Sequence, residues 1–213
     1  MIKSGITQGT PSKILFGAGV YFKGVPWSLT AAPTEEEIKA NIIGATQEGG
    51  TLTITPEFFA PELDGALVPL KELQKKVGET AIMEVSFAEL TPDLITHQVI
   101  GRAKTWDGQP YDVVQSDDQV RPEHFYEGFG YYGTYFDGRP LIIVFKNALC
   151  TSGFTTDSKN KTNSVFKGTF TCMSDLEFGV TRLPYAIFMH NGESWTPVNE
   201  NGAPIDPEPG AAE

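Results

Sequence analysis

The strongest structural signal in the chain lies in residues 124–149, which read HFYEGFGYYGTYFDGRPLIIVFKNAL. The pair Asp137-Gly138 divides this segment into two runs of aromatic and β-branched residues, and such a pair supplies the positive φ angles of a two-residue hairpin turn. We therefore expect a β-hairpin with arms His124–Phe136 and Arg139–Leu149. Both arms are apolar on both faces, which predicts that a helix or a neighbouring subunit covers each side.

Period-two alternation of apolar and polar residues predicts strands in five further segments, residues 13–22, 51–58, 80–87, 164–173 and 182–189. Strands with one polar face are typical of antiparallel sheets. In two of the segments the polar positions are mainly threonines, namely Thr51, Thr53, Thr55, Thr169 and Thr171. The pattern indicates a mainly β protein.

Two short helices interrupt this pattern. Thr34-Glu-Glu-Glu37 has the spacing of a capping box, and Thr91-Pro92-Asp93 caps a second helix that is expected to run to about residue 100, just before Gly101. Apart from the first helix, residues 23–50 form a long connection between strands. Connections of this length are commonly functional or disordered in isolation.

The charge and hydrophobicity of the chain exclude some classes of function. The chain has 213 residues, of which 16 are basic and 27 acidic, so its formal net charge is -11 and it is poorly suited to grip nucleic acid through phosphates. The longest apolar run, Leu141–Phe145, is too short to cross a bilayer, and the N-terminal residues lack the apolar segment of a signal peptide. We therefore expect a soluble protein made in the cytoplasm, with no membrane partner.

Residues 191–213 differ in composition from the rest of the chain. They contain four prolines, three glycines, five acidic residues and no basic residue. We expect a domain over residues 1–190, followed by a flexible acidic tail over 191–213.

No catalytic constellation is evident. Gly128-Phe-Gly-Tyr-Tyr-Gly133 matches a dinucleotide-binding pattern, but it lies in a strand pattern and not in a turn that opens a helix, so we interpret its glycines as structural. His97, His124 and His190 are scattered, and Cys150 and Cys172 are interpreted as buried reduced thiols, although a disulfide stays open. We predict no enzyme activity, no cofactor and no metal.

Several short segments follow one another in a distinctive order between about residues 12 and 190. They are IGATQEGGTLTITPE (43–57), ELDGA (62–66), KVGE (76–79), EVSFAELTP (84–92), NALCTSG (147–153), KNKTNSVF (159–166) and LPYAI (183–187). Together they resemble the major tail protein, or tail tube protein, of siphophages that infect Gram-positive bacteria. Each segment alone is weak, and the specificity lies in their number and order.

The resemblance implies the tail-tube fold, two packed antiparallel sheets with a flanking α-helix and long assembly loops. It implies that six copies close into a ring and that rings stack into a hollow tube within the virion, assembled in the host cytoplasm. DNA would pass through the tube during genome ejection without tight binding. Tape measure, tail-terminator and distal tail proteins would be its other partners.

With this resemblance in place, two sets of residues acquire expected roles. We expect Thr51, Thr53, Thr55, Thr169 and Thr171 to line the lumen, because hydroxyl groups solvate a wall without clamping phosphates; an ordinary outward sheet face is the alternative. We expect the connection to reach adjacent subunits through apolar side chains, which are Trp27, Ile38, Ile42 and Ile43.

Two other functions stay open. A distal-tail or baseplate ring protein of the same fold would form one closed ring and no filament. An acidic β-sandwich enzyme or carbohydrate-binding module would show a concave aromatic patch, with Trp106, Tyr111 and Tyr126 as candidates.

Overall fold

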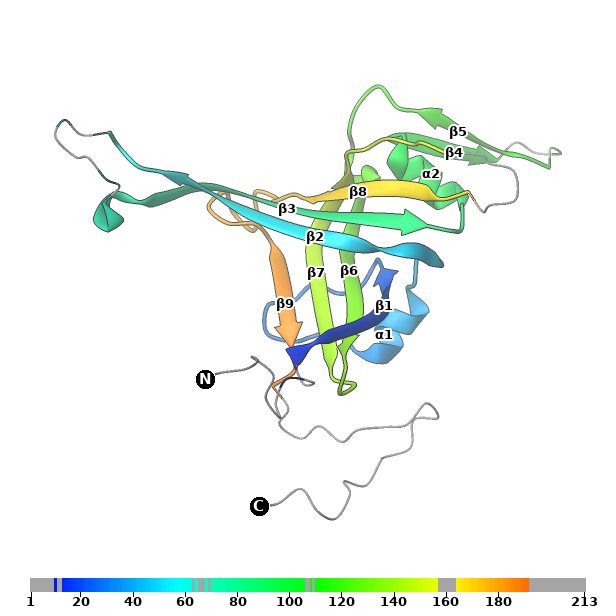
Figure 1. Ribbon diagram of the computed structural model, residues 1–213. Coiled ribbons are helices and arrows are strands. Elements are labelled where there is room, and N and C mark those ends of the chain that lie inside the picture. The colour runs from blue at the N-terminus through cyan, green and yellow to red at the C-terminus, as the bar shows by residue number, and fades with distance from the viewer. Residues whose placement is uncertain are drawn as a thin grey trace, which may run out of the picture.

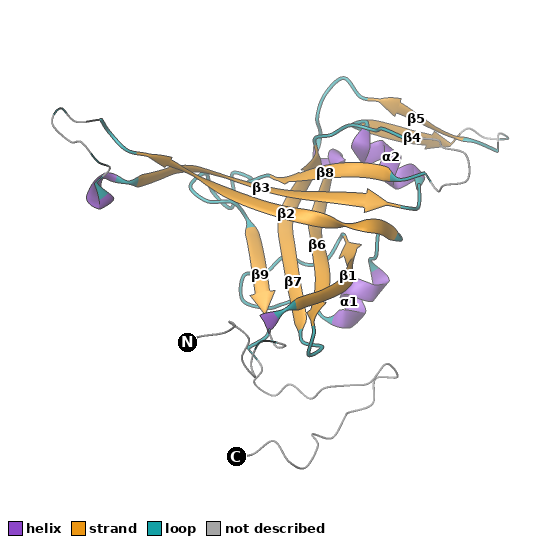
Figure 2. Cartoon of the chain, viewed as in Figure 1, coloured by secondary structure: helices purple, strands orange, loops and turns teal. Residues whose placement is uncertain are grey.

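A computed structural model describes residues 10, 13–62, 64, 68, 70–105, 108, 110–156 and 164–191. Nine strands and two α-helices make up this part of the chain (Figures 1 and 2). The strands are β1 (Leu15–Phe22), β2 (Thr46–Phe59), β3 (Lys75–Phe87), β4 (Gly101–Thr105), β5 (Asp112–Ser116), β6 (Phe125–Tyr135), β7 (Pro140–Cys150), β8 (Phe166–Cys172) and β9 (Tyr185–Met189). The helices are α1 (Glu35–Ala40) and α2 (Pro92–Gln98), with 3-10 turns at Lys71–Leu73 and Pro122–His124.

Strand β7 divides the main sheet into two layers. Its first half, Leu141–Phe145, pairs with β9, whereas its last residues, Ala148–Cys150, pair with β8 on the same edge. The sheet therefore continues from β7 through β8 and β3 to β2 in one direction, and through β6 to β1 in the other. In Figure 1, strands β2, β3 and β8 run across the direction of β6 and β7. All pairings are antiparallel, and the prediction of a mainly β, two-layered antiparallel fold is confirmed.

The main core fills the space between the two layers. Aromatic rings dominate it, and Phe129 of β6 and Phe170 of β8 meet across the layers with ring centroids 4.5 Å apart. Helix α2 closes one end through Leu94. The buried members are Tyr21, Ala81, Met83, Val85, Phe87, Leu94, Tyr126, Phe129, Ile143, Phe145, Ala148, Cys150, Phe166, Phe170 and Cys172.

The opposite face of the β6–β7 hairpin is covered by the chain itself. Ile142 and Val144 of β7 pack against Phe22, Val25 and Ile38, which come from β1, the connection and α1. The expectation that both faces of the hairpin are covered is therefore confirmed. A helix covers one side as expected, α1 together with the connection, but on the other side the cover is the layer of β2, β3 and β8 and neither a helix nor a neighbouring subunit.

The hairpin turn is wider than predicted. Only Gly138 of the Asp137-Gly138 pair has a positive φ, 84°, and the turn closes with the Gly138 amide donating to the Tyr135 carbonyl at 2.9 Å. The Asp137 carboxylate accepts from the Arg139 amide at 3.3 Å and from Arg139 Nε at 2.7 Å. These side-chain bonds stabilise the longer loop. The prediction of a two-residue turn was therefore wrong, because the observed loop is longer.

At Gly128 the strand β6 is kinked, and the alternation of its side chains between the two faces of the sheet is interrupted there. Tyr126 and Phe129 both enter the main core, although strict alternation would send them to opposite faces. Gly128 has φ 56°, and a Cβ there would lie 1.9 Å from the Val25 carbonyl oxygen. The glycine-rich run therefore lies within a strand for steric reasons, which confirms the structural interpretation.

Both helices lie where their capping signals predicted. Thr34 accepts from the Glu37 amide at 3.3 Å in a complete capping box, and Thr91 accepts from the Leu94 amide at 3.2 Å. The small β4–β5 sheet beside α2 was not predicted, and β2 starts at Thr46, within the expected connection. None of the described helices has the length and apolarity that crossing a bilayer requires.

Candidate assembly surface

The layer formed by β2, β3 and β8, which we call the outer layer, carries a face rich in hydroxyl groups. Strands β2, β3 and β8 place Thr51, Glu84 and Thr169 in one cross-strand row. The next row contains Thr53, Ile82 and Thr171, and a third pairs Thr55 with Thr80. Directly paired residues point to the same side of a sheet, so these side chains share the side opposite the main core. We call this set, together with Thr151, the threonine face.

The structure thus brings together all five threonines that the sequence singled out. Thr51, Thr53 and Thr55 are exposed, and Thr169 and Thr171 are half-buried. The Thr151 hydroxyl lies 3.0 Å from that of Thr171 and extends the face to the end of β7. Their proposed position in a lumen stays a prediction.

Sequence reasoning missed the middle strand of this face. Thr80 and Glu84 occupy the polar positions of the alternation in β3, opposite the buried Ala81, Met83 and Val85. The same alternation that predicted the apolar side of β3 could have identified these residues. The order of β3 between β2 and β8, however, is a long-range property that alternation does not reveal.

One long edge of the sheet is open. Among the described strands, β2 pairs only with β3, so the other edge of β2 presents unpaired backbone amide and carbonyl groups. Such an edge is a template for pairing with another chain. It borders the threonine face directly.

Strands β2 and β3 extend past the body of the molecule as an arm (Figure 1). We define the arm as residues 56–62 and 70–79, the described ends of the two strands and the 3-10 turn between them. Phe58 and Phe59 are 64% and 55% exposed, and Val77 is exposed on the facing strand. Within the described part of the chain these side chains stay largely exposed, and exposed aromatic side chains on a projecting ribbon are a candidate surface for contact with another chain.

The four apolar residues of the connection lie in different environments. Ile38 is 1% exposed and packs in the chain's own core, while Trp27 and Ile43 are half-buried against the two cores. Ile42 is 43% exposed. The inter-subunit role of the connection stays a prediction, and Ile42 is the exposed residue that can carry it.

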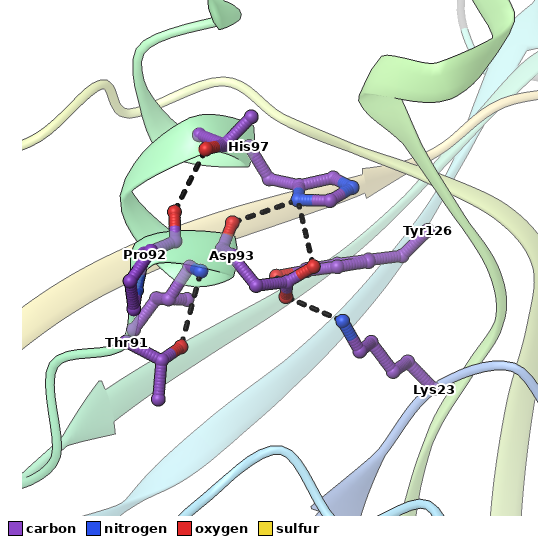
Figure 3. Close-up of polar contacts among 8 residues, drawn as sticks. Lys23, Thr91, Pro92, Asp93, His97 and Tyr126 are labelled. Atoms are coloured by element: carbon purple, nitrogen blue, oxygen red, sulfur yellow. Dashed lines mark hydrogen bonds and ion pairs between the residues drawn. The ribbon is translucent and has the colours of Figure 1, made fainter. Parts of the chain in front are cut away.

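A polar cluster ties the start of the connection to α2 and β6 (Figure 3). The Asp93 carboxylate binds the Lys23 ammonium group and accepts from the Tyr126 hydroxyl at 2.9 Å. The His97 ring stacks on the Tyr126 ring with centroids 3.8 Å apart, and its Nδ1 lies 2.9 Å from the Asp93 carbonyl oxygen. Burial raises the pKa of Tyr126 and lowers that of His97, so the hydroxyl stays a donor and the imidazole stays neutral.

A second charged cluster surrounds His124. His124 is buried and lies 3.8 Å from Asp117, which pairs with Arg102 at 2.6 Å. Among the described residues, no group of His, Cys, Asp or Glu has an arrangement that could hold a metal ion.

Both cysteines are buried and free, as interpreted from the sequence, and burial raises the pKa of Cys172 to about 12.

The aromatic patch of the carbohydrate-binding alternative is not assembled from the described residues. Tyr126 is buried in the core, whereas Tyr111 is exposed on the loop before β5. Trp106 lies outside the described residues, as does the tail after Asn191, so the predicted domain boundary stays a prediction.

No family model matches the chain, and no curated protein matches it. Among solved structures, the fold is similar to a chain in the virion of a native gene transfer agent particle, with a TM-score of 0.37 and 10% sequence identity over 80% of this chain and 95% of that chain. At this level of similarity the likeness identifies no family, and the resemblance to siphophage major tail proteins stays a prediction.

Proposed function

We propose that this chain is a virion structural protein, the subunit of a phage tail tube in which six copies form a ring and rings stack into a hollow tube. The observation that carries the proposal is the threonine face, which spans three strands and borders the open edge of β2. The resemblance to siphophage major tail proteins supports the same assignment. The chain acts through assembly, without enzymatic turnover, cofactor or metal.

The open edge supports a ring. If the β2 edge of one copy pairs with the outer layer of the next, the sheets continue into a closed barrel in which no edge stays free. Contacts between unlike surfaces of identical copies form a ring when the rotation closes. The threonine face then lies on one wall of the barrel in every copy.

The chemistry of that face suits the passage of DNA. Its side chains are mainly threonines, Glu84 is its charged member, and Lys167 lies at its margin on β8. The net charge of -11 on each copy repels phosphates, and hydroxyl groups hold water without the bidentate grip of arginine. A wall of this kind lets a duplex slide during genome ejection.

The arm supports stacking. Its exposed phenylalanines extend past the body, where they can reach another copy. Tape measure, tail-terminator and distal tail proteins are the expected partners of the tube.

Negative-stain electron microscopy of the purified protein at low and high concentration, beside size-exclusion chromatography, tests the proposal. Hollow tubes of stacked rings at high concentration are the expected result. Single rings that never stack would identify the distal-tail or baseplate alternative. Monomers at every concentration, even after addition of preformed tail-tip complexes as initiators, would overturn the assembly function.

A further inference from the structure

Basic side chains gather in one groove of this acidic chain. The groove lies between the base of the arm and the loop that joins β8 to β9, and its lining includes Lys75, Lys76, Val77, Val180 and Arg182. We call these five lining residues the basic groove. Glu79 also lines the groove, and it accepts from the Tyr185 hydroxyl at 3.2 Å, which holds the start of β9 against β3.

The cations of the basic groove are available to an anionic ligand. Lys76 pairs with Glu79 at 2.7 Å, but within the described part of the chain neither Lys75 nor Arg182 pairs with a carboxylate. The Arg182 guanidinium lies over the Phe178 ring at 4.9 Å, which positions the cation and leaves its N–H groups free of that ring. Val77 and Val180 are 59% and 85% exposed and add an apolar floor beside the charges.

The sequence contains one segment with the matching chemistry. Residues 192–213 read GESWTPVNENGAPIDPEPGAAE, with five carboxylates and no basic residue. After Glu200 the same segment carries the apolar side chain of Ile205. We propose that this acidic segment docks in the basic groove of its own chain, with carboxylates on Lys75 and Arg182 and the Ile205 side chain on Val77 and Val180.

The chain after β9 is long enough to return to the basic groove. Strand β9 starts beside the groove and carries the chain away from it over a span of about 17 Å for its five residues. An extended chain from Asn191 to Glu200 spans about 30 Å, so the carboxylates from Glu200 onward can return to the groove. A tethered segment has an effective concentration in the millimolar range, roughly, which lets individually weak ion pairs hold it.

Zero-length carbodiimide cross-linking of the full chain, followed by peptide mass spectrometry, tests this docking. The dilute sample is an equal mixture of ordinary and nitrogen-15-labelled protein. We expect links from Lys75 or Lys76 to Glu200, Asp206 or Glu208, at a yield roughly fivefold above links from Lys167 to the same acids, and within chains of one isotope. About 0.5 M salt should abolish the excess, because it screens the pairs.

A matched pair of variants completes the experiment. Arg182→Glu should lower the yield of links at Lys75 and Lys76, whereas Lys167→Glu, also at an exposed position, should leave the yield at those two lysines as in the unchanged chain. Equal link yields at Lys75, Lys76 and Lys167 would overturn the docking, and links between unlike isotopes would replace it with docking between copies. The measurement uses dilute monomer, so its outcome is independent of tube formation.

Discussion

The Tyr126 hydroxyl donates to the Asp93 carboxylate at 2.9 Å and so fastens helix α2 to the core strand β6. Lys23 binds the same carboxylate from the start of the connection. Burial opposes ionisation of Asp93, but the hydrogen bonds from Lys23 and Tyr126 outweigh it and hold its pKa below the usual value. One carboxylate therefore links three segments that are far apart in the sequence.

Asp93→Asn should lower the free energy of unfolding by about 1 kcal/mol at pH 7. A pKa lowered by folding stabilises the protein above the unfolded pKa of about 3.9, and this contribution is lost as pH falls through the folded value. Urea unfolding at neutral and acidic pH should therefore show a difference between the variant and the unchanged chain that shrinks below about pH 4. Glu36→Gln, at an exposed position, is the control. A difference of the same size at both pH values would contradict the role of the carboxylate.

Gly128→Ala should destabilise the chain by about 3 kcal/mol or more, because it adds backbone strain and a collision. The φ of 56° disfavours an L side chain, and the added Cβ would meet the Val25 carbonyl oxygen. Gly153→Ala is a matched control, since Gly153 has φ 70° but open space around its Cβ position. Its cost should be about 1–2 kcal/mol in the same thermal denaturation experiment. Equal costs would mean that the hairpin kink is not held by steric contact.

Local sequence signals predicted most of the helices and strands, but they do not predict contacts between residues that are far apart in the chain. Capping residues at Thr34 and Thr91 determine helix starts through bonds to nearby amides, and alternation determines strands through the period of the pleat. The prediction of a two-residue turn at Asp137-Gly138 was wrong, and the loop that forms instead includes Arg139, whose guanidinium donates to the Asp137 carboxylate and, at 3.2 Å, to the His190 carbonyl. A contact over that separation leaves no local pattern.

The candidate site was predicted in part for the same reason. The threonines of β2 and β8 were visible as polar faces, but their alignment depends on β3, which lies between them in the sheet. The apolar residues of the connection were identified as a group, yet Ile38 of α1 is buried against the β6–β7 hairpin while Ile42 is exposed. Periodicity identifies which residues are apolar and does not distinguish a core inside the chain from a contact between chains.

Ile38→Ala should destabilise the monomer by about 2–5 kcal/mol, because it leaves a cavity between α1 and the β6–β7 hairpin. Ile42→Ala should cost less than about 1 kcal/mol in the monomer, since much of its side chain already contacts water. Urea unfolding of both variants at low protein concentration makes the comparison. A negligible cost for Ile38→Ala would mean that the connection is not part of the monomer core.

Phe58→Ser should leave the monomer nearly as stable as before, within about 0.5 kcal/mol, but should raise the concentration needed for assembly at least about tenfold. The side chain is 64% exposed on the arm, so a contact with another copy is where its apolar surface is buried. Phe136→Ser is the matched control, with 60% exposure at the hairpin turn. Sedimentation of assembled material against protein concentration provides the measurement. An equal shift for both variants would remove the special role of the arm.

Thr51→Lys combined with Thr53→Lys should leave the monomer folded, because both side chains are exposed, but it should convert the proposed tube into one that retains DNA. Each ring of six would add twelve cations to the wall, and phosphate binding through cations weakens steeply with salt. Tubes assembled with linear duplex DNA should therefore sediment with the DNA at low salt and release it at about 0.5 M salt.

Val113→Lys combined with Gln115→Lys adds the same charge on exposed positions of β5, outside the threonine face. If the threonine face lines the lumen, this control should retain DNA only on the outer surface, where a nuclease can digest it, whereas DNA held by the threonine-face variant should be protected. Protection in both variants, or in neither, would mean that β2 faces something other than the lumen. Nuclease protection therefore separates a lumen wall from an ordinary outward sheet face.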